Sequence, residues 1–387
     1  MAKVSCKLAV SLILMVCGIQ STIAEKLTSS IVATVLRQSD KNVIFSPWLL
    51  TESLMHLHLA AGGKTAHEIN KVCQLNSESK SEILENFSNY QESINISESQ
   101  TLHMANRLFL ASDINLSSEY LQQENEIFPN SSQSVDFAKS SETIRIINNW
   151  IAEESNGTIT KLVEQLDAKT KALSLSAIYF KGLWKYAFNR NNTKKSTFYI
   201  PKETGEPRQI KVDMMFRRGL YRLDMIDKLD AMFLEIPYDS LQLSMVILLP
   251  KTVNGINKII NNLDQMDIDE ISPKTNEMYV QVYLPKFHLD VELSLNEALK
   301  SLGVVEIFQK ANFSAMTNSK VDLKVDKIFQ KSIIEVGEEG LADVAPQDLG
   351  FSFLRFPIEI VIRIDHPFVV LIKDHDKIYL AGRVTME

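Results

Sequence analysis

The sequence is poor in cysteine, glycine and proline. Its 387 residues include three cysteines, 13 glycines and 11 prolines. Three cysteines cannot form the dense disulfide framework that holds small secreted domains together. The low glycine and proline content argues against long flexible linkers. A fold of this size must therefore be stabilised by the packing of its own core.

The sequence also lacks an excess of positive charge. The formal net charge is −7, with 45% hydrophobic and 23% charged residues. These fractions are typical of an ordinary globular protein. Because a nucleic-acid-binding surface is usually basic, we expect no nucleic-acid partner. No shift in composition and no internal repeat marks a boundary between domains.

Long apolar runs are missing everywhere except at the N-terminus. Lys3 and Lys7 precede an apolar run from Leu8 to Ile19, and small residues at Thr22 and Ala24 follow it. This three-part pattern predicts a signal peptide over residues 1–24. The alternative is a retained membrane anchor, but the run is shorter than the roughly 20 residues that span a bilayer. We therefore expect a secreted, extracellular protein that has no membrane partner.

An exported chain would keep a single cysteine, Cys73, which we expect to be buried rather than reactive. Such a chain could also carry N-linked glycans on Asn-x-Ser/Thr sequons. The candidate sites are Asn86, Asn95, Asn115, Asn130, Asn156, Asn191 and Asn312. Asn312 is the weakest candidate because Phe313, beside it, suggests packing.

Motifs for catalysis, nucleotides and metals are absent as well. There is no Gly-x-Ser-x-Gly nucleophile elbow, and His67-Glu68 has no second histidine at the spacing of a zinc protease. Residues 62–65 (GGKT) resemble the end of a phosphate loop, but its first glycine would fall at His58. With seven histidines and few cysteines, a zinc site is not indicated. We predict no enzymatic activity, no cofactor and no metal.

Hydrophobic spacing places helices mainly in the first half of the chain and strands in the second. The predicted helices cover residues 26–38, 48–61, 143–154 and 293–302. The predicted strands cover residues 43–45, 172–180, 231–236, 243–249, 278–284, 321–336, 358–364, 368–372 and 378–384. This distribution favours an α+β fold with large mixed sheets.

Several short motifs occur in an order that resembles the serpin family. They are Asn42–Pro47, Ala60–Thr65, Ala105–Phe109, Val135–Phe137, Ala177–Trp184, Ile236–Tyr238, Leu284–Phe287, Glu338–Gly340, His366–Phe368 and Gly382–Val384. Each motif is weak alone. Their order over residues 26–385 identifies the chain as a member of the family, and its general character resembles that of insect male accessory-gland (seminal-fluid) serpins.

The resemblance implies one domain over residues 25–387, with about nine helices, three β-sheets and an exposed reactive-centre loop at about 340–357. In such proteins a serine protease cuts the loop and becomes covalently attached, and the loop then inserts into the central sheet. Family spacing places the cut between Leu354 and Arg355, or one residue later. Leu354 would suit a chymotrypsin-like target and Arg355 a trypsin-like one. We expect a monomer.

The loop hinge departs from the family pattern. It comprises Glu338, Glu339, Gly340, Leu341, Ala342, Asp343, Val344, Ala345 and Pro346. After insertion, alternate residues from Leu341 would face the core, which includes Asp343. A buried unpaired aspartate is costly, and proline is rare in central strands. These departures leave a second hypothesis open: a serpin that does not trap but acts as a protease substrate, a decoy or an extracellular binding protein, with the aromatic segment 351–356 as a docking surface.

The resemblance also implies a region where the central sheet opens. Ser46, Leu49, Ser176 and Gln330 match the polar positions beneath the sheet, and only Ser46 has the usual residue. Trp184 matches the end of the sheet where the loop first enters. Lys286 is expected to pair with Glu338.

Overall fold

The computed structural model describes residues 28–73, 75, 79–92, 101–239, 243–266, 275–317, 323–340, 360–375 and 377–387. The predicted signal peptide, the hinge from Leu341 to Pro346 and the bond between Leu354 and Arg355 lie outside these residues. Within the described ranges, no helix has both the length and the apolar character needed to cross a membrane.

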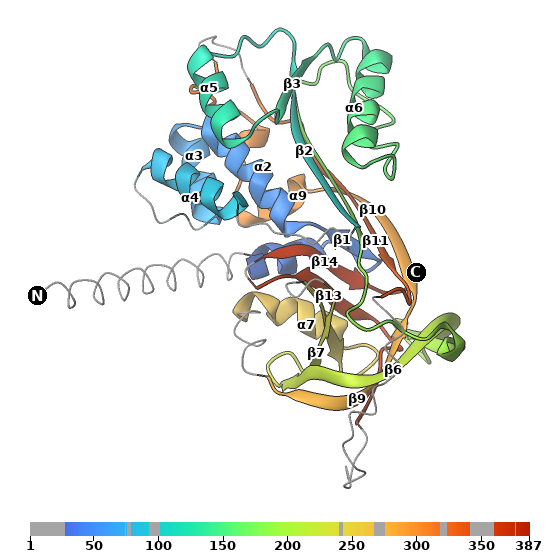
Figure 1. Ribbon diagram of the computed structural model, residues 1–387. Coiled ribbons are helices and arrows are strands. Elements are labelled where there is room, and N and C mark those ends of the chain that lie inside the picture. Colours follow the sequence, from blue (N-terminus) through green and yellow to red (C-terminus); the bar gives the residue numbers. More distant parts are fainter. Residues whose placement is uncertain are drawn as a thin grey trace, which may run out of the picture.

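Strands far apart in the sequence form a five-stranded sheet (Figure 1). Its order is β10 (Phe287–Ser294), β11 (Lys327–Val336), β4 (Ala172–Lys181), β2 (Thr101–Ala111) and β3 (Ser132–Val135). Nine of the ten residues of β4 are buried. A continuous apolar run suits a strand that is covered on both faces, and the prediction of a central strand here is confirmed.

A nine-stranded sheet occupies the other half of the molecule. Its order is β1 (Val43–Phe45), β14 (Ile378–Val384), β13 (Phe368–Lys373), β8 (Ser244–Pro250), β7 (Ala231–Pro237), β6 (Arg208–Ile226), β9 (Glu277–Pro285) and β12 (Ile360–Arg363), with β5 (Lys194–Ile200) also paired to β6. The 19-residue strand β6 pairs with β5 and β9 along one part and with β7 along the other. The family resemblance implied three sheets. The described residues form two, because β6 joins the strands of the nine-stranded sheet into one.

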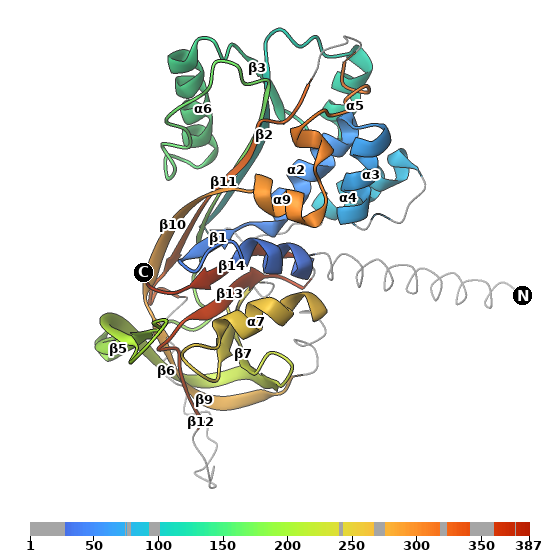
Figure 2. The ribbon, with the colours of Figure 1, turned by 180° about the vertical axis from the view of Figure 1, so that it is seen from behind.

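Helices cover the five-stranded sheet on both sides (Figures 1 and 2). The helix α6 (Ser140–Glu154) lies over one face. The other face carries α2 (Pro47–Ala60), α3 (Gly63–Val72), α4 (Lys80–Glu92), α5 (Ser118–Ile127) and α9 (Asn296–Leu302). A further helix covers residues 28–36, and α7 (Ile256–Asn262) packs on β8 and β13.

The helix α2 begins at Pro47, one residue before its predicted start at residue 48. The Ser46 side chain accepts a hydrogen bond from the backbone N–H of Leu49, and Pro47 occupies the first helical position. Both features favour a helix start. Almost the whole helix is buried, because it packs against β2, β4 and β14.

Some predicted boundaries are wrong. The helix expected from Leu293 begins only at Asn296, because Leu293 and Ser294 still pair with β11. The strand expected from Val321 begins at Lys327. The prediction also missed β2, β3, β5, β6 and β10. Two of them, β2 and β3, lie in the first half of the chain, which therefore contains more strand than expected.

Candidate functional site at the seam between β4 and β11

The middle of the five-stranded sheet is a parallel seam between β4 and β11. Nine residue pairs, from Lys327 with Leu173 to Glu335 with Lys181, lie directly opposite one another. No strand separates β4 from β11 over this length. A long stretch of chain connects these two neighbouring strands. Another strand could therefore insert between them and pair with each, without any change in the path of the chain.

A buried polar group, here called the Gln330 cluster, spans this seam from beneath. It consists of Gln330 on β11, Ser176 on β4 and Ser46 at the start of α2. The Gln330 amide donates to the Ser176 hydroxyl (3.1 Å) and to the Ser46 carbonyl oxygen (3.3 Å), and its oxygen accepts from the Ser46 N–H. Gln330 is 1% exposed. The cluster therefore ties both strands of the seam to α2.

The fourth position assigned to this region, Leu49, contributes through its backbone. Its carbonyl oxygen accepts hydrogen bonds from the Ser53 hydroxyl (2.9 Å) and the Asn106 amide (3.4 Å). The Ser53 hydroxyl also lies 3.0 Å from the Asn106 Oδ1 atom. Sequence reasoning missed Ser53 and Asn106. Asn106 lies next to Arg107 in β2, so its polarity alone did not single it out.

Replacing Gln330 with leucine is expected to destabilise the uncleaved protein by about 1–3 kcal/mol, because the buried Ser46 N–H loses its acceptor. The midpoint of urea unfolding measures the effect. Ser332→Ala is the matched control: the Ser332 hydroxyl makes only a 3.4 Å contact with the Gln330 oxygen, so this variant should change stability much less. Equal effects of both variants would contradict this role for the cluster.

Trp184 closes one end of the seam. Its indole N–H donates to the Gly337 carbonyl oxygen (2.7 Å), and its backbone N–H donates to the Glu339 carbonyl oxygen (3.0 Å). The ring stacks on Tyr238 with 4.4 Å between centroids. Gly340 pairs with Trp184 so closely that a Cβ atom there would lie 2.6 Å from the Trp184 carbonyl oxygen. Only glycine fits this approach.

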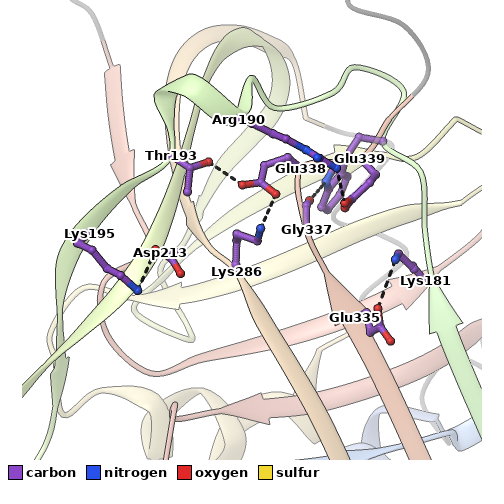
Figure 3. A network of polar contacts seen from close by, with 11 residues as sticks. Lys181, Arg190, Thr193, Lys195, Asp213, Lys286, Glu335, Gly337, Glu338 and Glu339 are labelled. Carbon is purple, nitrogen blue, oxygen red and sulfur yellow. Dashed lines mark hydrogen bonds and ion pairs between the residues drawn. The ribbon is translucent and has the colours of Figure 1, made fainter.

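A second group at this end, here called the Glu338 cluster, holds the first residues of the hinge (Figure 3). The Glu338 carboxylate accepts hydrogen bonds from Lys286 Nζ (2.5 Å) and from the Thr193 hydroxyl (2.8 Å). The predicted contact between Lys286 and Glu338 is thus present. The neighbouring Glu339 pairs with Arg190 (3.0 Å), whose side chain is 74% exposed.

The pKa of Glu338 lies below its ordinary value. Burial acts to raise this pKa, but the hydrogen bonds from Lys286 and Thr193 outweigh the effect of burial. The charged form is therefore favoured, and it anchors the start of the hinge to β9 and β10 through Lys286, which lies between these strands.

This depressed pKa predicts an acid-sensitive contact. A carboxyl group whose pKa is lower in the folded state stabilises that state above its unfolded pKa of about 4.3. The stabilisation is lost as the pH falls through the folded pKa. Thermal unfolding between pH 3 and 6 should show wild type more stable than Glu338→Gln at pH 6, with the difference shrinking toward pH 3.

Glu339→Gln is the control for this experiment, because exposed ion pairs contribute little to stability. A difference between wild type and Glu338→Gln that stays constant from pH 6 to pH 3 would refute the assignment.

Asp326 closes the opposite end of the seam, and sequence reasoning missed it. Its carboxylate accepts hydrogen bonds from the backbone N–H groups of Lys171 (2.7 Å) and Ala172 (3.3 Å), where β4 begins. Its own N–H donates to the Ala172 carbonyl oxygen (2.8 Å). The seam is therefore held at both ends and in the middle.

Comparison with known proteins identifies the family. The profile of the family described as "Serpin (serine protease inhibitor)" matches residues 22–386. This chain belongs to the serpin family. The match covers both sheets and the whole seam, so the fold predicted from the sequence is confirmed.

This serpin has relatives in mammals and insects. It is 32% identical to leukocyte elastase inhibitor A of Mus musculus and 31% identical to Serpin B11 of the same species, each over 89% of this chain and 92% of the relative. It is 29% identical to Antichymotrypsin-2 of Bombyx mori, over 86% of this chain and 88% of the relative.

Solved structures agree with the fold. Mouse protein-Z dependent protease inhibitor superposes with a TM-score of 0.83 at 24% identity, covering 94% of this chain and 97% of that one. Serpin48 of Tenebrio molitor superposes with a TM-score of 0.80 at 26% identity, with the same coverage.

Five of the glycosylation candidates have exposed side chains in this serpin: Asn115, Asn130, Asn156, Asn191 and Asn312. Phe313 is buried, in agreement with the packing expected beside Asn312, whereas Asn312 itself is exposed. The side chain of Asn86 and the whole of Asn95 lie outside the described residues. The buried position expected for Cys73 is confirmed, and burial raises the pKa of its thiol to about 12.

Proposed function

We propose that this serpin is a secreted inhibitor of a serine endopeptidase that acts by loop cleavage, covalent trapping and insertion of the cut loop between β4 and β11. The closed seam is the observation that carries the proposal. Two parallel strands pair directly, and insertion of an antiparallel strand between them would add hydrogen bonds along both. That gain is free energy available only after cleavage.

The two polar clusters support the same mechanism. The Glu338 cluster and Trp184 fix the point at which the hinge meets the sheet. The Gln330 cluster lies in the path of an inserting strand, because Gln330 and Ser176 would be separated. The names of related proteins, such as leukocyte elastase inhibitor and antichymotrypsin, favour an elastase-like or chymotrypsin-like target, which suits cleavage after Leu354.

The second candidate is a serpin that is cut without trapping. Asp343 favours it, because alternation places this residue on the core face of the inserted strand. On that face β4 and β11 present Ile178, Phe180 and Ile334, each 0% exposed. A carboxylate in such surroundings must be paired or protonated, at a free-energy cost of several kcal/mol.

A denaturing gel tests the proposal. The purified chain without residues 1–24 is mixed with chymotrypsin and, separately, with trypsin, and then denatured in SDS. A band near the sum of the two masses establishes trapping, and the enzyme that gives it chooses between Leu354 and Arg355. Cleavage near residues 354–356 without that band establishes the substrate role. A heat-stability measurement on the cleaved product separates insertion from simple cutting, since insertion raises the unfolding temperature.

Export and glycosylation are tested with the full chain. Expression in a secretory host should deliver protein that begins at Glu25 to the medium, and glycosidase treatment should lower its mass. Retention in the cell with residues 1–24 still attached would contradict export.

A further inference from the structure

Exposed apolar side chains concentrate on three adjacent strands of the nine-stranded sheet. Seven large apolar side chains are more than a third exposed among the described residues, and five of them lie on β6, β9 and β12. They are Leu220, Met225, Met278, Tyr279 and Val361. Such concentrated exposure is unusual for a surface that only faces solvent.

Strand register places part of this group on a single face with two arginines. Leu220 lies opposite Tyr279, Phe216 opposite Tyr283, and Tyr283 opposite Arg363. Arg218 and Val361 flank Gln281 in the row between. Directly opposite residues point to the same side of a sheet. The surface, here called the β12 patch, consists of Arg218, Leu220, Tyr279, Tyr283, Val361 and Arg363.

The arginines of the β12 patch rest on aromatic rings. The Arg363 guanidinium lies 3.9 Å from the centroid of the Tyr283 ring, and Arg218 lies 5.9 Å from that of Phe216. The two rings are 4.7 Å apart. Stacking on a ring restricts the side chain, and at Arg363 it leaves the edge of the planar guanidinium able to receive a carboxylate. Aromatic residues and arginine are also the types that are enriched in protein interfaces.

In the sequence, β12 closely follows the predicted site of cleavage. Ile360, where β12 begins, is the fifth residue after Arg355, and five residue steps span at most about 18 Å even when fully extended. A protease domain of about 240 residues has a radius of gyration of about 18 Å. A protease bound at the scissile bond must therefore lie beside β12.

We propose that the β12 patch is a second docking surface for the protease that cuts the loop, and that it selects proteases with carboxylates around an apolar area next to the active site. This inference rests on the proposed function, because it concerns the same partner. The apolar side chains would contribute close packing, and the arginines would accelerate association with an acidic surface.

The test compares rates of loop cleavage. The wild-type protein is mixed with each of a panel of trypsin-like, chymotrypsin-like and elastase-like proteases. The rate constant for disappearance of the uncleaved protein is measured, with trapped and cleaved products counted together. The fastest enzyme should act on the Arg218→Glu/Arg363→Glu variant about tenfold more slowly than on wild type at low salt. The difference should shrink at high salt, because exposed charges are screened.

The control reverses the same number of charges elsewhere. Lys139→Glu/Arg145→Glu alters exposed residues at the start of α6 and within it, far from β6 and β9 (Figure 1). This variant should react at the wild-type rate. Equal rates of loop cleavage for the wild type and both variants would overturn the inference. So would a wild-type loop that is cleaved no faster than a synthetic peptide of residues 341–359.

The outcomes separate this inference from the proposed function. Cleavage that slows in the patch variant but gives no SDS-stable band supports the β12 patch and overturns trapping. A stable band that forms equally fast in every variant supports trapping and overturns the patch. A dimer of the wild type that dissociates in the patch variant would show that the surface joins two copies of this chain, which also overturns the inference.

Discussion

The Asp343→Ala/Pro346→Thr variant is expected to trap a protease at least tenfold more efficiently than the wild-type chain, relative to simple cleavage. In the wild type, insertion would bring a carboxylate beside Phe180 and Ile334 and would leave a proline without an N–H in a central strand. Removing both faults lowers the free energy of the inserted state. A change of about 1.4 kcal/mol already alters the ratio of trapped to simply cleaved protein tenfold.

The measurement is the fraction of chymotrypsin or trypsin recovered in the SDS-stable band. Asp348→Ala is the control, since it removes one carboxylate from a position that alternation places on the opposite face of the inserted strand. Efficient trapping by the wild type would show that the free energy gained at the seam exceeds the cost of the hinge. The interpretation of Asp343 would then be wrong.

The Trp184→Ala variant is expected to lose about 3–5 kcal/mol of stability, the usual range for removing a buried tryptophan. Trp184 is 1% exposed and contacts both Tyr238 and Phe188. Its loss leaves a cavity at the end of the seam and removes the donor to the Gly337 carbonyl oxygen. The midpoint of urea unfolding, measured on the uncleaved protein, reports the change.

Trp184→Phe separates the two contributions. Phenylalanine keeps a ring against Tyr238 but lacks the indole N–H, so this variant should lose only about 1–2 kcal/mol. A Trp184→Ala variant as stable as Trp184→Phe would contradict the importance of packing at this position. Because Trp184 also holds the start of the hinge, both variants should accept an added loop peptide into the sheet faster than the wild type does.

Local physical rules were enough for several elements. Hydrophobic spacing placed α2 to within one residue at each end, and the apolar run from Ala172 marked β4. The order of short motifs was sufficient to predict the serpin fold. Even the contact between Lys286 and Glu338 was anticipated, although only from the family resemblance.

The long strand β6 was missed because its pattern is mixed. Only part of β6 is buried, and charged residues such as Arg217 and Arg218 interrupt the alternation. Its neighbours β5, β9 and β7 complete it along different parts of its length. Which residues of such a strand face the core depends on these partners, and no local pattern specifies them.

The sequence by itself determined the central apolar strand β4, because this strand depends on side-chain type and on neighbouring residues, and the order of the short motifs determined the fold. Tertiary structure alone decided that Gln330 meets Ser46, 284 positions away, that Asp326 closes the seam, and that β6, β9 and β12 align aromatic rings with arginines. These contacts depend on strand register, and register is fixed only when the whole sheet assembles.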